Sequence, residues 1–218
     1  MNALRGVVIK DLGLTDYQPV FEAMQSFTAR RDENTLDEIW FTEHRPVFTQ
    51  GQAGKPEHVL APGNIPIVQS DRGGQVTYHG PGQITGYLLF NLRRMQLGVR
   101  SLVTGIEAAM SDTLSLYEIA GEPRTDAPGI YVRGDKIGSL GLRVRRGCSY
   151  HGLSLNVDMD LEPFSRINPC GLFGVQVTHM AAFAPVTLEE VKGELTDALL
   201  KQYGLSRHIP RNLVGETA

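Results

Sequence analysis

The sequence lacks any long hydrophobic run. None of its apolar stretches approaches the roughly 20 residues that a membrane-spanning helix needs. The segment Met1–Arg5 also does not open a long apolar stretch of the kind that marks a secretory signal. We therefore expect a protein that does not associate with a membrane and that works in the cytoplasm.

Cysteine is scarce, and neither sign of charge dominates. The 218 residues include 2 cysteines, too few for a disulfide framework, so we expect free thiols in a reducing compartment. With 24 acidic and 21 basic side chains the net charge is -3, which argues against a nucleic-acid binder. No His/Cys cluster has zinc-site spacing and no glycine pattern matches a phosphate cradle, so we expect neither a metal nor a cofactor.

The patterns that are present predict an α+β fold. Helical spacing predicts helices over 17–31 and 101–120, and a capping box at Thr187–Glu190 opens a last helix that should end at Gly204. Short β-rich runs predict strands at 7–9, 38–41, 65–68, 75–79, 83–91, 129–132, 136–146 and 151–159.

Most of these strands cluster in the middle of the chain, and the Arg133–Asp135 segment is a good hairpin turn. This arrangement favours a mixed or mainly antiparallel sheet with helices over a regular βαβ alternation. We expect a single domain over residues 1–218, either undivided or with a small C-terminal lobe from about Val186.

The two thiols have different surroundings. Cys148 continues the even-numbered apolar face of the predicted strand 136–146, which is typical of a buried structural cysteine. Cys170 lies within Asn168–Gly171, where the preceding proline fixes the backbone and the following glycine leaves space beside the sulfur. This spacing fits both a nucleophile and an inert loop thiol.

A nucleophilic cysteine must be ionised. A free thiol has a pKa near 8.5, so a neighbouring cation or general base has to favour the thiolate at neutral pH. The candidates are the lysines with His79, His151 and His179, although His151 fits a structural role better than that of a base. Lys136 stands apart because it begins a predicted strand, yet a solvated lysine at a hairpin edge is the commoner outcome.

The strongest local signal is the segment from Arg72 to Gln83. Its glycines and prolines let the backbone approach a ligand closely, and Arg72 and His79 supply polar groups. An ordinary hairpin would also explain the glycines. His79 can either orient a ligand or brace the glycine loop, and the sequence does not choose between these roles.

Taken together, these segments resemble the lipoyl(octanoyl) transferase family. The segments that carry the resemblance are Arg72–Gln83 with Tyr87, Gly129–Val132, Lys136–Leu142, Arg145–Leu153 and Asn168–Gly171. They occur in the order typical of the family and cover roughly residues 38–180. A composite pattern of this length is far more specific than any single motif.

The resemblance implies the fold of the biotin and lipoate protein ligase catalytic domains. It implies transfer of an octanoyl or lipoyl group from acyl carrier protein, with octanoyl-acyl carrier protein as the usual donor, to a specific lysine of lipoyl domains. The acceptors would be the 2-oxoacid dehydrogenase complexes and the glycine cleavage H protein, in the first step of endogenous protein lipoylation.

The resemblance also implies roles for individual residues. Cys170 would be the acyl-thioester nucleophile and Lys136 its catalytic partner, whereas Cys148 matches a non-catalytic position. The implied acyl-binding residues are Arg72, Gly73, Gly74, Gln75, Val76, Thr77, Tyr78, His79, Ser139, Leu140, Gly141, Gly152, Leu153 and Ser154.

Charge pairing suggests how one lysine could serve both half-reactions. The Lys136 ammonium would favour the Cys170 thiolate, and acylation would remove that negative charge. The lysine could then accept a proton from the attacking amine. Glycines 138, 141 and 152 would let the acyl tail lie close to the sheet, relieve crowding between strands, or do both.

A basic run at Arg143, Arg145 and Arg146 is either a solvated strand face or a surface that steers acidic partners.

Three other functions fit parts of the pattern. An ATP-dependent lipoate or biotin ligase of the same fold would need no nucleophilic cysteine. A cysteine hydrolase would use water in place of the amine. A non-catalytic protein that binds acyl groups or lipoyl domains could keep the fold without turnover.

Overall fold

The computed structural model describes residues 6–169 and 175–208. Within these ranges, eight strands form one sheet in the order β11-β1-β2-β6-β10-β9-β8-β7, and three form a second sheet in the order β4-β3-β5. The strands are β1 (Gly6–Thr15), β2 (Asp37–His44), β3 (Val47–Gln50), β4 (Ile67–Gln69), β5 (Val76–His79), β6 (Gln83–Leu89), β7 (Glu122–Pro123), β8 (Gly129–Val132), β9 (Asp135–Arg145), β10 (Cys148–Asn156) and β11 (Ser206–Arg207).

The helices lie near both ends of the chain and once between them. They are α1 (Tyr17–Arg30), α2 (Leu92–Met95), α3 (Val99–Ser115) and α4 (Leu188–Tyr203), with short 3₁₀ helices η1 (Pro56–His58), η2 (Glu162–Arg166) and η4 (Met180–Ala182). In the large sheet β1 pairs in parallel with β2 and β11, and the remaining neighbours are antiparallel. The predicted α+β fold with a mixed, mainly antiparallel sheet is confirmed.

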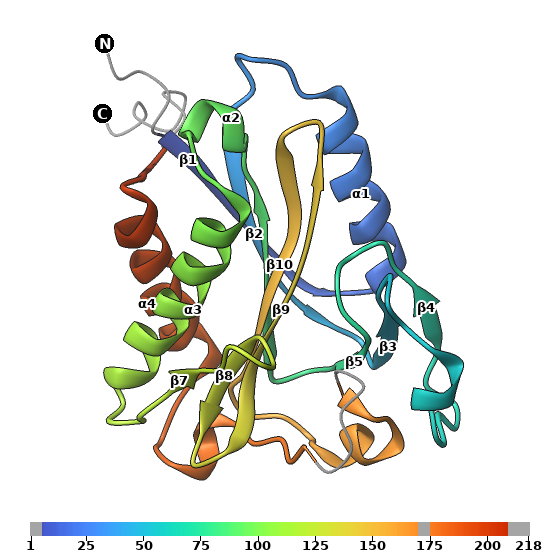
Figure 1. Cartoon of the computed structure of the whole chain (residues 1–218). Helices are drawn as coiled ribbons and strands as arrows, with labels where there is room; N and C mark the ends of the chain where they lie inside the picture. The colour runs from blue at the N-terminus through green and yellow to red at the C-terminus, as the bar shows by residue number, and fades with distance from the viewer. Residues whose placement is uncertain (1–5, 170–174, 209–218) are drawn as a thin grey trace, which may run out of the picture.

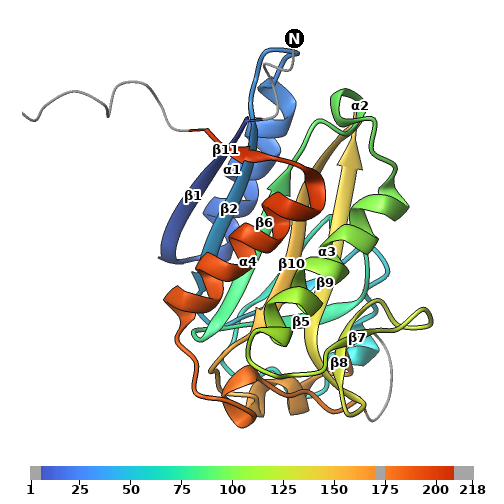
Figure 2. The same cartoon turned by 90° about the vertical axis from the view of Figure 1, so that its left-hand side faces the viewer.

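The large sheet lies between two covering layers. Figures 1 and 2 show α3 and α4 side by side on one face, with α1 and the small sheet on the other. The helix pair and the sheet share one core, to which α4 contributes Val191, Leu195 and Leu199. Helix α4 therefore packs into the same core as the large sheet.

Local signals explain where the main helices form. Helix α1 buries Tyr17, Val20, Phe21 and Met24, the spacing of one helical face. Helix α4 begins at the predicted capping box, where Thr187 accepts a hydrogen bond from the backbone N–H of Glu190. It ends at Gly204, whose left-handed backbone (φ 59°) glycine adopts without strain.

The turns that flank β9 fix the central hairpins. Arg133 and Gly134 both have positive φ (53° and 95°), as a two-residue turn between antiparallel strands requires. Arg146 and Gly147 repeat this arrangement at 55° and 80°. The prediction that Cys148 continues the strand 136–146 is therefore wrong. It begins β10 after the second turn, although it is buried as expected.

Three other predicted boundaries shift. Helix α3 starts at Val99 with Gly98 as its N-cap and ends at Ser115, because Glu118 adopts a left-handed backbone (φ 59°) that a helix cannot continue. The strand predicted at 65–68 is β4, two residues later. Strand β10 ends at Asn156 because the next two backbone N–H groups donate to Gly82 O instead of a neighbouring strand.

Central strands β6 and β10 are buried on both faces. The apolar side of β10, including Leu153 and Leu155, packs into the core under α3 and α4. Its polar side, including Ser154 and Asn156, is buried as well, at 5% exposure each. Burying a polar group raises the free energy of the fold unless the group is hydrogen-bonded. This buried polar face therefore indicates a specific polar site. Among the described residues, no helix is long and apolar enough to cross a membrane.

We predict that Gly82→Ala destabilises the fold by about 2–4 kcal/mol. Gly82 has φ 85°, and an added Cβ would lie 1.8 Å from Asp158 O. The same substitution at Gly193, in α4 with open space around it, should instead stabilise the protein by about 1 kcal/mol. Urea unfolding of both variants measures the difference, and equal stabilities would contradict this account.

Candidate active site

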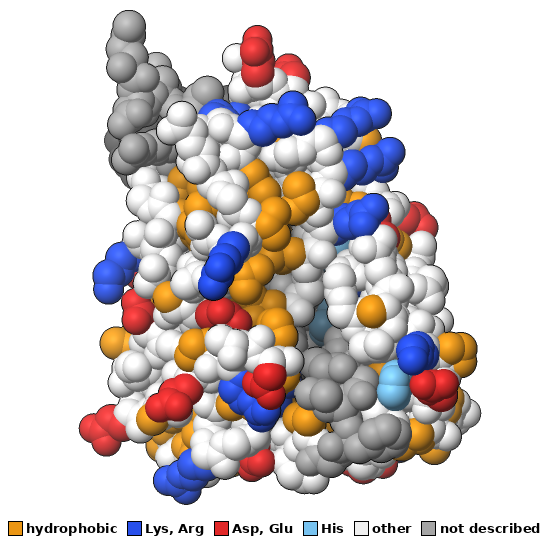
Figure 3. Space-filling model, in the orientation of Figure 1, with side chains coloured by type: hydrophobic (Ala, Val, Ile, Leu, Met, Phe, Trp, Pro, Cys, Tyr) orange, Lys and Arg blue, Asp and Glu red, His pale blue; other side chains and the backbone are white. Residues whose placement is uncertain are grey.

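A cleft opens between the glycine-rich segment and the hairpin of β9 and β10. It holds about 510 Å³ of empty space, its open mouth included. Figure 3 shows a recess on this face, beside a band of hydrophobic side chains over α3 and β9. Most of the predicted acyl-binding residues line the cleft, namely Arg72, Gly74, Gln75, Val76, Thr77, His79, Ser139, Leu140, Gly141, Gly152, Leu153 and Ser154.

Two predicted acyl-binding residues do not line the cleft. The backbone N–H of Gly73 donates to Leu142 O at 2.9 Å, which fastens the glycine-rich segment to β9. The ring of Tyr78 turns away and packs against Phe48 and Phe164, with centroids 5.5 and 5.4 Å apart. The structure thus places Gly73 in the cleft's support and Tyr78 in a separate hydrophobic cluster.

Arg72 holds the glycine-rich segment from beneath. It is 8% exposed, and its guanidinium donates to Thr49 Oγ1 and to the carbonyl oxygens of Thr49, Gly73 and Gln75 at 2.6–3.2 Å. These donors are directed to the Thr49 hydroxyl and to backbone carbonyls of the protein itself. Arg72 therefore shapes the cleft wall from within.

Close packing explains two of the glycines in the cleft. A Cβ at Gly152 would lie 2.2 Å from Gly86 O on the neighbouring strand β6. One at Gly141 would lie 3.0 Å from the Arg72 side chain. Gly152 therefore relieves crowding between two strands, whereas Gly141 leaves room for the Arg72 side chain.

Four further residues line the cleft although no sequence pattern predicted this position for them, namely Tyr17, Thr85, Tyr87 and His151. Thr85 and Tyr87 lie on β6 at a spacing of two residues, which places them on one face of the strand. That spacing was the available signal for them. Tyr17 is the first residue of the buried face of α1, so its pattern indicated only a core position.

A carboxylate positions His151 at the cleft wall. Asp71 accepts hydrogen bonds from Tyr150 Oη at 2.5 Å and from His151 Nε2 at 2.8 Å. Burial opposes ionisation of Asp71, but these bonds and one from Gln25 outweigh it and lower its pKa to about 2. His151 has φ 58°, an uncommon backbone for a residue with a side chain, and its ring lies 5.0 Å from that of Tyr150.

His79 also lines the cleft, as a neutral ring. Burial, reinforced by the nearby His44, lowers the pKa of His79 to about 3. Burial likewise lowers the pKa of His44 to about 4, and His44 Nε2 lies 2.6 Å from Tyr87 Oη. The ring of Tyr17 stacks on His79 at 6.0 Å. Both histidines are therefore uncharged at neutral pH.

Lys136 is buried near the start of β9 and is not among the residues that line the cleft. Its ammonium donates to Pro128 O at 2.9 Å and lies 5.3 Å from the ring centroid of Tyr131. Its backbone N–H donates to Gln176 O, and its carbonyl accepts from Thr178 N, both at 2.9 Å. The expectation of a solvated lysine at a hairpin edge is therefore wrong.

The remaining candidate residues for the chemistry are Cys170 and His179. Cys170 lies outside the described residues. Asn168 and Pro169, which precede it, line one hollow together with Val175–Val177. His179 does not line the cleft; its Nδ1 accepts a hydrogen bond from Met159 N.

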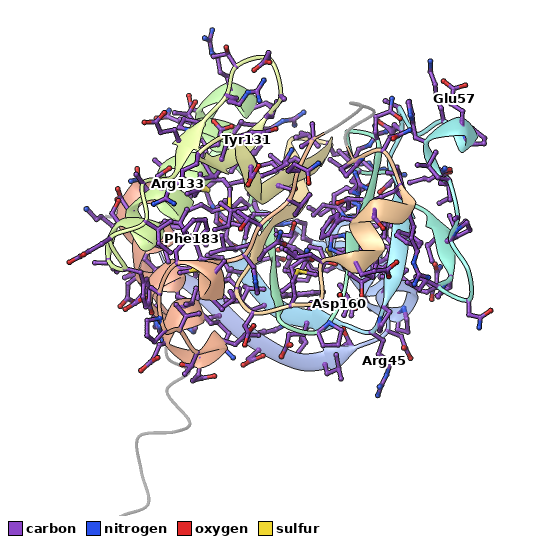
Figure 4. All side chains as sticks on the ribbon, turned by 90° about the horizontal axis from the view of Figure 1, so that it is seen from below. Arg45, Glu57, Tyr131, Arg133, Asp160 and Phe183 are labelled. Atoms are coloured by element: carbon purple, nitrogen blue, oxygen red, sulfur yellow. The ribbon has the colours of Figure 1, made fainter. Side chains whose placement is uncertain are left out.

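A second hollow lies at the lower end of the sheet, near β8. Its lining includes Tyr131, Arg133 and Phe183. The view from below in Figure 4 shows Arg133 next to Phe183, and the guanidinium carbon is 5.6 Å from the ring centroid. Arg133 is exposed and Phe183 is partly buried in this contact.

The chain matches known proteins over most of its length. Residues 16–200 match the family model of the lipoyl protein ligase A/B catalytic domain. An octanoyltransferase of Xanthomonas campestris pv. campestris (strain B100) is 60% identical over 198 residues, covering 90% of this chain and 85% of the relative. An octanoyltransferase of Ectopseudomonas mendocina (strain ymp) is 57% identical over 200 residues, covering 91% and 98%.

Solved structures agree with the fold. A lipoate-protein ligase A bound with ATP superposes with a TM-score of 0.79 at 15% identity, covering 94% of this chain and 88% of that chain. A biotin protein ligase from Aquifex aeolicus superposes with a TM-score of 0.55 at 10% identity, covering 91% and 69%. The predicted resemblance is confirmed, and the chain belongs to the lipoyl protein ligase A/B catalytic domain family and, within it, to the octanoyltransferases.

Proposed function

We propose that this protein transfers an octanoyl or lipoyl group from acyl carrier protein to a lysine of lipoyl domains, through a thioester on Cys170. The acceptors would be lipoyl domains of 2-oxoacid dehydrogenase complexes and the glycine cleavage H protein. The chain would act as one catalytic domain in the cytoplasm, where Cys170 stays a free thiol. The observation that carries the proposal is the 57–60% identity to octanoyltransferases over about 90% of the chain.

The surroundings of Lys136 support its proposed role. The segment 176–178 pairs with both backbone groups of Lys136: Gln176 O accepts from its N–H, and Thr178 N donates to its carbonyl. This segment begins six residues after Cys170 in the chain. The described residues on either side of Cys170–Gly174 line one hollow. Chain connectivity therefore supports a Cys170 sulfur within reach of the Lys136 ammonium.

In the first half-reaction the Cys170 thiolate attacks the donor thioester. The bond from the carbonyl carbon to the donor sulfur breaks, and the departing thiolate takes a proton from the Lys136 ammonium. In the second half-reaction a neutral acceptor amine attacks the new thioester. Lys136, now neutral, accepts the amine proton while the Cys170 thiolate leaves, which restores the starting ion pair. Since a thioester is converted to an amide, no ATP is consumed.

The cleft would hold the acyl tail. Burying about seven methylene-type groups at about 0.8 kcal/mol each supplies several kcal/mol of binding free energy. A chain that is longer or shorter by one or two such groups changes this free energy only modestly. We therefore propose that selection of acyl length is graded and not absolute.

We predict a covalent octanoyl adduct on Cys170 after incubation with octanoyl-acyl carrier protein in the absence of ATP. Intact-protein mass spectrometry should show an adduct that hydroxylamine removes and that an apo lipoyl domain discharges. Cys170→Ser should form none, whereas Cys148→Ser, at a cysteine buried at the start of β10, should behave like the parent. Transfer that persists in Cys170→Ser, or that requires ATP, would exclude the proposed route.

We expect Lys136→Met to slow both acylation and transfer by about 100-fold or more, because it removes the proton donor and acceptor. Single-turnover rates of the two half-reactions measure this effect. Lys201→Met is the matched control, since that lysine lies in the last turn of α4 with its side chain 77% exposed. Parental rates in Lys136→Met would contradict its role.

We also expect the basic run to steer the acidic partners. Arg145 and Arg146 are exposed at the hairpin between β9 and β10. Changing both to Gln should lower kcat/KM about fivefold at low salt and flatten its dependence on ionic strength. The control changes Lys201 and Arg207 to Gln, which removes the same charge at the far side of the sheet. Equal effects in the two double variants would argue against steering by this surface.

A further inference from the structure

A chain of buried hydrogen bonds connects the cleft to the backbone of Lys136. His79 Nδ1 pairs with Gln83 Oε1 at 2.7 Å, and Gln83 Nε2 donates to Asn156 Oδ1 at 2.9 Å. Asn156 Nδ2 donates to Thr178 O at 2.9 Å, and Thr178 N donates to Lys136 O at the same distance. All five residues are at most 8% exposed, so water competes little for these bonds.

Two backbone carbonyls set the direction of this chain. Gln83 Nε2 also lies 3.2 Å from Tyr78 O, and a carbonyl can only accept, so this end of the Gln83 side chain must be the amino group. Thr178 O fixes the Asn156 amide in the same way. Gln83 therefore presents its carbonyl oxygen to His79, and His79 must carry its proton on Nδ1.

The fixed tautomer has a consequence at the cleft. With Nδ1 protonated and the ring neutral, Nε2 of His79 keeps its lone pair and can only accept a hydrogen bond. His79 is therefore both braced by the protein and able to face a ligand. The two roles that the sequence left open are compatible, because different ring nitrogens perform them.

The other end of the chain holds the strand segment beside Lys136. Gln176 O and Thr178 N bond to the Lys136 backbone, and Asn156 bonds to the carbonyl of that same Thr178. The Asn156 side chain thus ties β10 to the segment that runs from Cys170. A shift of this segment would break the bond to Asn156 and disturb the whole chain as far as His79.

We propose that Gln83 and Asn156 are positioning residues for the acyl transfer. They hold the segment 176–178 against Lys136. They also fix the tautomer of His79 at the cleft. Because the chain runs from Cys170 to this segment, they would in turn help to bring Cys170 toward Lys136. This inference rests on the proposed function. A merely structural role would lower stability without changing the chemistry of the folded enzyme.

The test is Asn156→Asp in the full-length protein. This nearly isosteric change keeps an acceptor for Gln83 but replaces the donor to Thr178 O with a carboxylate oxygen, which repels that carbonyl. We expect kcat for octanoyl transfer from octanoyl-acyl carrier protein to fall about tenfold or more, with KM changed less than about twofold, because misplacement of reacting groups affects mainly turnover.

A second readout reports the thiolate directly. The rate of Cys170 alkylation by iodoacetamide, resolved by mass spectrometry, should reach its half-maximum at higher pH in Asn156→Asp than in the parent. Gln83→Glu removes the hydrogen bond from Gln83 Nε2 to Asn156 Oδ1 and keeps an acceptor for His79 Nδ1. It should therefore lower kcat as well.

Thr113→Val is the matched control. It removes a buried hydrogen bond from Thr113 Oγ1 to Ala109 O within α3, and Thr113 does not line the cleft. It should lower the urea midpoint and leave kcat and the alkylation profile unchanged. If Asn156→Asp and Gln83→Glu behave like this control, the positioning role is wrong. Undiminished transfer by Cys170→Ser would instead refute the proposed function, and the positioning role with it.

Discussion

The buried guanidinium of Arg72 is the group on which the cleft depends. Its bonds to Thr49, Gly73 and Gln75 join the small sheet to the glycine-rich segment. Gly73 in turn bonds to Leu142 of β9, so a single cation connects both sheets around one opening. A charge-assisted network of this kind is rigid, and it keeps the wall in place before any ligand arrives.

Local patterns were sufficient to predict much of the fold. The apolar face that begins at Tyr17, the capping box at Thr187 and the turn at Arg133 each act within a few residues, so the sequence reports them directly. The small sheet was not predicted as a unit. Strand β3 has four residues, and its neighbours β4 and β5 pair with it across long loops whose closure no local signal encodes.

The site was predicted in part, and the missing part is non-local. The family resemblance located the segments that line the cleft. It did not reveal the Asp71 cluster, because Asp71 lies 79 and 80 residues from Tyr150 and His151. The left-handed backbone of His151 has no glycine or asparagine to mark it. Asn156 lies in the predicted strand 151–159, but no local pattern reveals its partners, because these depend on how β10 meets the segment 176–178.

The parallel edge of the large sheet constrains the order in which the molecule can assemble. Strand β1 pairs with β11, so Gly6 and Val7 lie beside Ser206 and Arg207. The hairpin of β9 and β10, by contrast, pairs residues that are near neighbours in the chain. During synthesis the hairpin is available before the outer edge, which is complete only after Ser206 and Arg207 have left the ribosome. Until then the Gly6–Val7 end of β1 has an unpaired edge, where a nascent chain can pair with other strands.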